Sequence, residues 1–320
     1  MADYRAIKGL NIQTVAGDPS NLVAGDIWYN STLGKVRGAK IPAGSWSSGG
    51  NLITGRKSHG SAGTQTANLV YGGDGPSASQ AICESYDGTS WTESPDLQTA
   101  RRCGPGLGTQ TAAIQAGGSP VPDQTIVESF NGSAWSETHE LNTARDAGAG
   151  SVGISTAGLI VGGAPGVAAT ETYNGSSWTA TADLNEGRQL MGVFGTSTSA
   201  ICAGGESPQV DDVESFDGTS WSEVDDMNTN AQRRGGAGSS NTEGLVIGGL
   251  VDPPTTANTE QWDGSSWTEV ANLSTSRYGP GGTSASTASS LAIASGGHPN
   301  RSQATEEWDQ ALAAVTFTSS

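Results

Sequence analysis

One sequence motif recurs along this chain, and its spacing limits the folds that the chain can adopt. A tryptophan is followed by an arginine, ten residues later in five copies and twelve in one, and then by a Gly-Gly pair and a glutamate. The tryptophans are Trp46, Trp91, Trp135, Trp178, Trp221 and Trp267, and the arginines are Arg56, Arg101, Arg145, Arg188, Arg233 and Arg277. The copies recur at about 42–48 residues, a length that suits a unit of four short strands.

Each copy is expected to form four strands. A stretch rich in glycine and small residues, such as 148–156, follows the arginine, and its small side chains suit the crowded innermost position. An apolar run that ends in Gly-Gly comes next and predicts a strand buried on both faces. The third strand carries the glutamate and an aromatic residue, an Asp-Gly or Asn-Gly pair predicts a hairpin turn, and the tryptophan opens the outer strand.

The sixth copy is divided between the two ends of the chain. Trp46 has no glutamate, aromatic residue and turn before it, whereas Glu306 and Trp308 have no tryptophan after them. Joining the two ends supplies what each lacks and would stop a terminal blade from peeling away. We therefore predict an all-β chain: residues 46–320 form a six-bladed β-propeller with four-stranded blades, closed by the N-terminal segment. The last residues, 314–320, are expected to add to the closing blade.

The repeat resembles a known family. Over about residues 46–310, the order of Gly-Gly, glutamate with an aromatic residue, and tryptophan resembles Kelch-type propellers. The "DGTSW" wording and the Asn-x-x-Arg spacing are similar to Kelch-like repeats of bacteriophage virion proteins. The segment "GDIWYNSTLGKVRG" at 25–38 is similar to one near the start of tail-fibre and other tail-associated proteins.

This resemblance implies a Kelch-like propeller carried on a phage tail, fibre or capsid surface and assembled in the host cytoplasm. Other virion proteins would be its partners in an oligomeric arrangement, and a host-surface glycan or receptor a further contact. A stand-alone Kelch-like interaction or carbohydrate-binding protein is the alternative, and a sialidase-like hydrolase comes third.

The charge of the chain argues against two classes of partner. Its net charge is −17 and its pI about 4.4, so its surface should repel both phosphate backbones and anionic lipid. We therefore expect no nucleic-acid binding. We expect no membrane insertion either, because no run of eighteen apolar residues exists. The N-terminus also lacks the apolar core of a signal peptide, so a soluble chain not exported by an ordinary leader is expected.

No catalytic, cofactor-binding or metal-binding residue is expected. The repeated arginine and glutamate predict an ion pair inside every blade, since scaffold devices repeat whereas catalytic sites are local. The segments 85–91 and 215–221 resemble the Asp-box of sialidases, but glycine follows aspartate one residue too early. The histidines His59, His139 and His298 occupy unrelated repeat positions, which argues against a shared metal site.

The three cysteines predict no disulfide framework. Cys83 and Cys202 fall where other copies carry buried aliphatic residues, so we interpret them as small core side chains. Cys103, beside Arg102 in a glycine-rich stretch, is left open.

Two regions are candidates for contact with partners. The connections between second and third strands vary in sequence, and the loops 74–80, 119–124 and 250–256 are predicted to face outward, unless they are plain solvated connectors. Residues 1–45 form an N-terminal arm whose apolar residues have no repeat partners, so residues 4–30 are predicted to contact another subunit, unless the arm wraps its own propeller. The loop residues are Asp74, Pro76, Pro120, Asp123, Asp252 and Pro253, and the arm residues are Ile7, Leu10, Ile12, Ile27, Trp28 and Tyr29.

Overall fold

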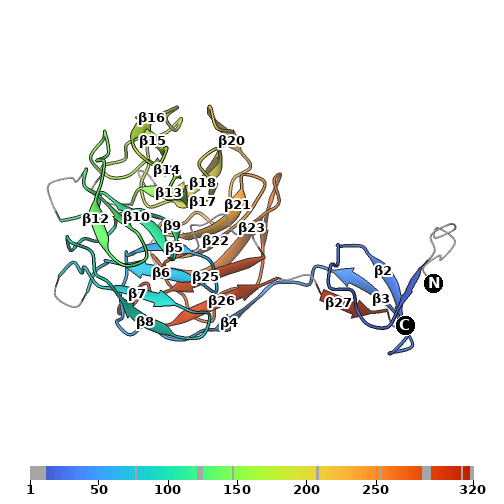
Figure 1. Ribbon diagram of the computed structural model, residues 1–320. Coiled ribbons are helices and arrows are strands. Elements are labelled where there is room, and N and C mark those ends of the chain that lie inside the picture. Colours follow the sequence, from blue (N-terminus) through green and yellow to red (C-terminus); the bar gives the residue numbers. More distant parts are fainter. Residues whose placement is uncertain are drawn as a thin grey trace. The chain divides into compact units, whose positions relative to one another are not determined.

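The computed structural model (Figure 1) describes residues 12–75, 78–120, 125–145, 148–206, 209–251, 254–282, 290–310 and 313–317. Every regular element in these ranges is a strand, and no helix long and apolar enough to cross a bilayer is found among them. The strands form seven sheets, one more than the six that the repeat predicts. The extra sheet lies outside the repeats.

The chain divides into two compact units. We name Ser45–Asp309 the repeat unit, and Met1–Gly44 together with Gln310–Ser320 the terminal unit. The predicted boundary at residues 45 and 46 is one residue from the observed one. The prediction that the C-terminal residues belong with the repeats is wrong, because residues 310–320 join the N-terminal segment instead.

Five sheets of the repeat unit have four antiparallel strands each, which neighbour one another in chain order. They are β5 (Gly60–Gly63), β6 (Asn68–Tyr71), β7 (Cys83–Tyr86) and β8 (Trp91–Ser94); β9 (Gly106–Thr109), β10 (Ala112–Ala116), β11 (Val127–Phe130) and β12 (Trp135–Glu137); β13 (Gly150–Ile154), β14 (Ala157–Val161), β15 (Thr170–Tyr173) and β16 (Trp178–Ala180); β17 (Gly192–Thr196), β18 (Ser199–Gly205), β19 (Val210–Phe216) and β20 (Trp221–Val224); β21 (Gly235–Ser240), β22 (Glu243–Leu250), β23 (Thr255–Trp262) and β24 (Trp267–Glu269).

The four predicted strand types occupy their expected places in these five sheets. Each glycine-rich stretch forms a first strand, each apolar run a second strand, and each glutamate lies in a third strand. Each fourth strand begins at the tryptophan of the repeat. Third and fourth strands pair so that the aromatic residue faces the tryptophan, as Tyr86 faces Trp91.

The sixth sheet combines both ends of the repeat unit, as the divided copy predicts. Its strands are β25 (Leu291–Ser295), β26 (Thr305–Asp309) and β4 (Ser45–Ser48), in the order β25-β26-β4. Trp46 pairs with Trp308, and their ring centroids are 5.5 Å apart. Beside β25, Gly281 makes an isolated bridge with Ser295.

The core of the repeat unit lies between neighbouring sheets. Among the described residues there are six apolar clusters, and each joins one sheet to the next. The sixth of these joins Ile293 of β25 to Val70 of β6, so the last sheet packs against the first. The apolar residues six positions past the tryptophans, such as Leu97 and Leu141, are buried in these clusters as predicted.

The first strands lie against one another, which explains their small residues. Contacts run from β5 to β9, β13, β17 and β21 in turn, and β21 also contacts β25, the apolar second strand of the sixth sheet. A Cβ atom on Gly236 of β21 would lie 2.1 Å from the carbonyl oxygen of Val193 in β17, closer than any side chain tolerates. Glycine at this position therefore sets the distance between adjacent sheets. This all-β arrangement is consistent with a β-propeller.

The terminal unit contains the seventh sheet. Its strands are β1 (Gln13–Val15), β2 (Ile27–Asn30), β3 (Lys35–Lys40) and β27 (Ala313–Thr316), in the order β1-β2-β3-β27. β1 and β2 are parallel, and the other pairs are antiparallel. The predicted addition of residues 314–320 to the closing blade is thus wrong, because β4 already takes the outer edge of β26 and β27 pairs with β3.

Candidate functional site

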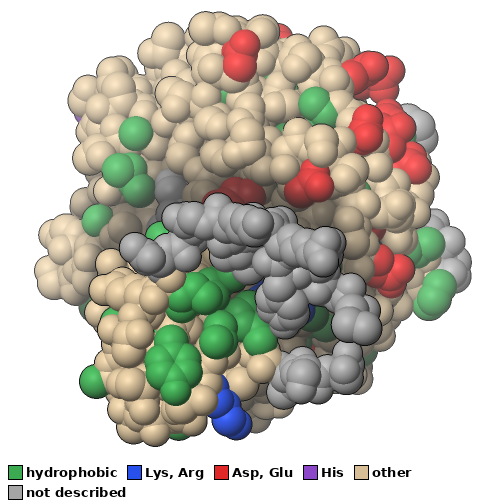
Figure 2. Space-filling model, turned by 90° about the vertical axis from the view of Figure 1, so that its right-hand side faces the viewer, with side chains coloured by type: hydrophobic (Ala, Val, Ile, Leu, Met, Phe, Trp, Pro, Cys, Tyr) green, Lys and Arg blue, Asp and Glu red, His purple; other side chains and the backbone are tan. Residues whose placement is uncertain are grey.

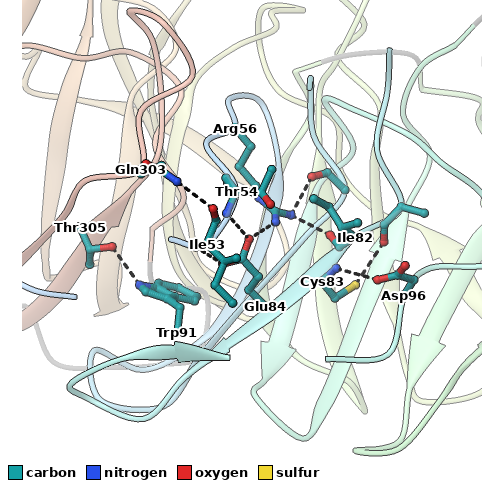
Figure 3. A network of polar contacts seen from close by, with 12 residues as sticks. Ile53, Thr54, Arg56, Ile82, Cys83, Glu84, Trp91, Asp96, Gln303 and Thr305 are labelled. Carbon is teal, nitrogen blue, oxygen red and sulfur yellow. Dashed lines mark hydrogen bonds and ion pairs between the residues drawn. The ribbon is translucent and has the colours of Figure 1, made fainter. Parts of the chain in front are cut away.

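The repeated arginine and glutamate form buried ion pairs that connect successive sheets. In Figure 3, the guanidinium of Arg56 contacts the carboxylate of Glu84 and also donates to the carbonyl oxygens of Gly72 and Ile82, at 3.2 and 2.7 Å. The same carboxylate accepts the backbone N–H groups of Ile53 and Thr54, at 2.7 and 3.1 Å. One glutamate therefore holds both the arginine and the crossover that carries it.

Equivalent pairs occur in the other five sheets. They are Arg101–Glu128, Arg145–Glu171, Arg188–Glu214, Arg234–Glu260 and Arg277–Glu306. All of these side chains are at most 4% exposed. Burial lowers the pKa of Arg101, and the charge of Glu128 opposes that shift. Pairs this deep serve the scaffold, as predicted, and offer nothing to a ligand.

Arg233 is a correction to the predicted set. The position equivalent to the other arginines is Ala231: a Cβ atom on Gly204 would lie 2.7 Å from the carbonyl oxygen of Ala231, just as one on Gly248 would lie 2.4 Å from that of Arg277. The neighbouring residue, Arg234, supplies the missing guanidinium, with Nη1 3.0 Å from Oε1 of Glu260. Arg233 is therefore not the arginine that forms the scaffold ion pair of this sheet.

An axial cavity of about 160 Å³ opens where the first strands begin, and a ring of six residues surrounds it. We name this the mouth ring: Ser58, Cys103, Gly148, Leu190, Arg233 and Gly279. Each member has a positive φ, from 53° to 67°, although four are not glycine. Such backbone is costly for residues with a side chain and is kept only where the surroundings impose it.

Backbone hydrogen bonds impose that conformation. From Cys103 to Gly279, the N–H of each ring member donates to the carbonyl oxygen of the preceding one, with N···O distances of 2.7 Å at Cys103, 3.2 Å at Gly148, 2.6 Å at Leu190 and Arg233, and 2.8 Å at Gly279. Gly279 also lies beside Ser58, since a Cβ atom on it would be 3.7 Å from the Ser58 nitrogen. The backbone thus repeats around the mouth while the side chains differ.

Four basic residues gather at one side of this mouth, and we name them the basic cluster: Lys57, Arg102, Arg233 and Arg301. The first three stand at or directly before a ring position. Asp74 lies among them, 3.4 Å from Nζ of Lys57, 3.7 Å from Nη1 of Arg102 and 3.6 Å from Nη2 of Arg301.

Aromatic residues complete this side of the mouth. The guanidinium carbon of Arg233 is 5.5 Å from the ring centroid of Tyr278, and Tyr278 stacks on His298 with centroids 4.4 Å apart. Burial, together with the charges of Lys57, Arg233 and Arg301, lowers the pKa of His298. Three members of the basic cluster therefore act on one imidazole.

The predicted outward loops are only partly described. Asp74 does not extend freely outward, because its side chain is 14% exposed and ion-paired, and Pro120 is exposed. Pro76, Asp123, Asp252 and Pro253 lie outside the described residues.

The predicted arm residues behave differently from one another. Ile12, Ile27 and Tyr29 are exposed, at 41%, 40% and 37%. Trp28 is a correction, because it is 2% exposed and its Nε1 donates to Oδ1 of Asp18 at 3.1 Å, so it forms the core of the terminal sheet. Ile7 and Leu10 lie outside the described residues.

The exposed side of the terminal sheet is apolar. Along β2, exposed Ile27 and Tyr29 alternate with buried Trp28 and Asn30. Tyr29 pairs across the strands with Val36 of β3, which is 37% exposed. Hydrophobic side chains on one face of the molecule are drawn green in Figure 2.

The cysteines fit their predicted structural roles where the prediction was definite. Cys83 and Cys202 are buried, and burial raises the pKa of each thiol to about 12. Cys103 lies in the mouth ring and is half-buried. The three side chains occupy three different sheets or crossovers.

Sequence reasoning missed the basic cluster. A signal for it was present: after one arginine per repeat is set aside, only Lys57, Arg102, Arg233 or Arg234, and Arg301 remain as basic residues within 45–309. Their convergence could not be read from the sequence, because they come from four different copies.

No family model matches the chain, and the search of curated proteins finds no relative.

Proposed function

We propose that this chain is a non-enzymatic virion protein of a bacteriophage, a six-bladed, Kelch-like β-propeller that the terminal unit attaches to the particle. Its propeller would present the channel mouth for contact with the host surface. The observation that carries the proposal is the contrast between a repeat unit whose repeated charged groups are paired with one another and a terminal sheet with an open apolar face.

Six blades in a closed ring are supported by the packing. Six apolar clusters join six consecutive sheets, and one of them joins the last sheet to the first. Hydrogen bonds also cross that final junction: Nε1 of Trp91 donates to Oγ1 of Thr305 at 3.0 Å (Figure 3), and Oγ of Ser61 donates to the carbonyl oxygen of Gly282 at 3.0 Å. A ring of this kind needs no neighbour to cover its sheets.

Attachment through the terminal unit is supported by where the exposed apolar residues lie. Among the described residues, eleven large hydrophobic side chains are exposed, and eight of these belong to the terminal unit. They are Ile12, Val23, Ile27, Tyr29, Leu33, Val36, Ile41 and Phe317. Apolar patches of this kind are typical of protein–protein contacts. The occupant that we propose is another virion protein.

A non-enzymatic role is supported by how the charged residues are used. Twelve of the repeated charged side chains are paired with one another in the scaffold. The residues that differ between copies at the mouth are basic, aromatic or small, a mixture that suits recognition.

The test is the composition and density of purified particles from the cells that produce this chain. We expect peptides of the chain in the particles and six-bladed density in a cryo-EM map. A chain that stays in the supernatant and binds glycans there would contradict the virion assignment and favour the stand-alone alternative.

Variants test the attachment surface. Tyr29→Ser with Val36→Ser should lower incorporation into particles by more than about tenfold, since an aromatic interface anchor contributes roughly 2 kcal/mol or more. Ile154→Ser is the matched control, because Ile154 is equally exposed, at 40%, but lies in the repeat unit. Equal incorporation of all three chains would place the attachment surface elsewhere.

A further inference from the structure

The basic cluster departs from the charge of the rest of the repeat unit. Residues 45–309 contain ten lysines and arginines against twenty-nine aspartates and glutamates. Six of the ten are neutralised inside the scaffold pairs, and the other four are Lys57, Arg102, Arg233 and Arg301. Every basic group that remains in this unit therefore lies at one side of the channel mouth.

In the part of the chain that the structure describes, one carboxylate is ion-paired with the basic cluster. Three cations share Asp74 as their carboxylate, at distances of 3.4 to 3.7 Å, which are long for charge-assisted hydrogen bonds. Arg233 contacts the Tyr278 ring. Among the described residues, the four cations therefore have a single paired carboxylate between them.

Polar atoms without partners point to a missing ligand group. Nε of Arg301 and Nδ1 of His298 are buried, and neither has a hydrogen-bond partner among the described residues. A buried polar group without a partner requires an explanation, and an absent ion or water is one such explanation. Both atoms belong to the group of residues that surrounds Asp74 and Tyr278.

A purely structural reading does not account for the arrangement. Structural pairs in this protein are repeated in every sheet, have side chains at most 4% exposed and use one carboxylate for one guanidinium. The basic cluster occurs once, Arg102 and Arg301 are 46% and 34% exposed, and Lys57 is 25% exposed. Its members can therefore be reached from solvent.

We propose that the basic cluster at the channel mouth binds an oxyanion group, a phosphate or a carboxylate, of a ligand that approaches from the side of the second-to-third-strand loops. Arg102 and Arg301 hold the oxygens, Lys57 and Arg233 supply charge, and Asp74 keeps the cations in place when the site is empty. The class of ligand rests on the proposed function: because the propeller would contact the host surface, the ligand is an acidic saccharide of that surface.

Titration calorimetry of the full chain tests the site. The probes are glucose 6-phosphate, glucuronate, inorganic phosphate and, as the neutral control, glucose. We expect the three anions to bind and glucose not to bind. Tighter binding of the two sugar anions than of inorganic phosphate identifies a saccharide as the carrier, whereas equal affinity identifies a free anion; either result supports the oxyanion site.

Single variants assign the residues. Arg301→Gln and Arg102→Gln should each weaken binding by about tenfold, the usual effect of losing a hydrogen bond to a charged group. Arg37→Gln is the matched control, because Arg37 also pairs with an aspartate but lies in the terminal unit. Asp74→Asn should tighten binding several-fold, which a merely structural aspartate would not do.

A direct readout does not depend on any variant. Phosphate should shift the NMR signals of the His298 imidazole, whereas exposed His139 serves as the internal control. An absence of anion binding, or binding that Arg301→Gln, Arg102→Gln and Arg37→Gln leave equally unchanged, would overturn the proposal. Particle incorporation is measured separately, so either proposal can fail alone.

Discussion

The terminal unit and the repeat unit differ in their charge and in how they bury apolar and charged side chains. The terminal unit has five basic against three acidic residues, whereas the repeat unit has ten against twenty-nine. The repeat unit buries its apolar strands between sheets and its guanidiniums against carboxylates. Among its described residues, the terminal unit buries few hydrophobic side chains besides Trp28 and leaves eight large ones exposed.

This contrast in burial bears on which unit can be stable by itself. A repeat unit in which every sheet is covered by the next one is complete by itself. A four-stranded sheet with one covered face has little apolar surface to bury within the chain. We therefore infer that the repeat unit sets the stability of the protein and the terminal unit sets its adhesion.

The largest expected effect comes from opening the repeat unit. A chain of residues 51–309 lacks β4 and Trp46, so Trp308 loses its partner and the unfolding free energy should fall by at least about 3–5 kcal/mol. A chain of residues 45–309 lacks only the terminal unit and should unfold like the full chain. Chemical denaturation of the three chains measures this. Equal midpoints for 51–309 and 45–309 would show that closure contributes nothing.

The second effect separates buried from exposed ion pairs. Glu128→Ala leaves the guanidinium of Arg101 buried without its carboxylate, and should cost about 3–5 kcal/mol of unfolding free energy. Arg37→Ala in the terminal unit breaks a pair whose side chains are 15% and 32% exposed, and should cost about 1 kcal/mol or less. If the two variants have the same urea midpoint, the repeated pairs are not the scaffold device described above.

The third effect is a pH dependence confined to the repeat unit, which contains all three histidines. Burial, together with the charge of Arg56, lowers the pKa of His59 to about 3. Between pH 6.5 and 3 the unfolded chain therefore binds a proton that the native chain does not. This contribution to stability is complete above pH 6.5 and is lost as the pH falls, by about 2.7 kcal/mol at pH 4.5.

Comparison of His59→Leu with the unaltered chain measures this contribution. The variant should show a flatter decline in unfolding free energy between pH 6.5 and 4.5. His139→Asn is the control, since His139 is exposed. A decline that is as steep in His59→Leu as in the unaltered chain would assign the acid sensitivity to other groups.

The sequence predicted what is repeated and failed where a copy departs from the pattern. Six equivalent copies averaged out local ambiguity, so the strand types, the turns and the pairing of Trp46 with Trp308 were all predicted. Arg234 was missed because it reaches Glu260 from the residue after the ring member Arg233, whereas the other scaffold arginines precede their ring members in the chain. The arginine side chain is long enough for the Arg234 guanidinium to pair with its glutamate from a different backbone position.

Residues without a repeated partner were harder to place. Trp28 has no counterpart that would reveal its burial, and nothing in the local pattern of 314–320 indicates that β3 is its neighbour. The basic cluster depends on contacts between residues as far apart in the chain as Asp74 and Arg301. Such contacts follow from closure of the repeat unit and cannot be read from any single segment.

The pairing of β3 with β27 makes the whole repeat unit an insertion into a hairpin. Lys40 faces Ala313, and Ser45 faces Asp309, so folding of the repeat unit delivers β27 to β3 and removes most of the entropy cost of closing so long a loop. Phe317, whose ring lies over Gly38, arrives with it. We therefore expect the terminal sheet to be completed last, on chains whose repeats have already folded, and on the proposed function attachment would then select finished molecules from incomplete ones.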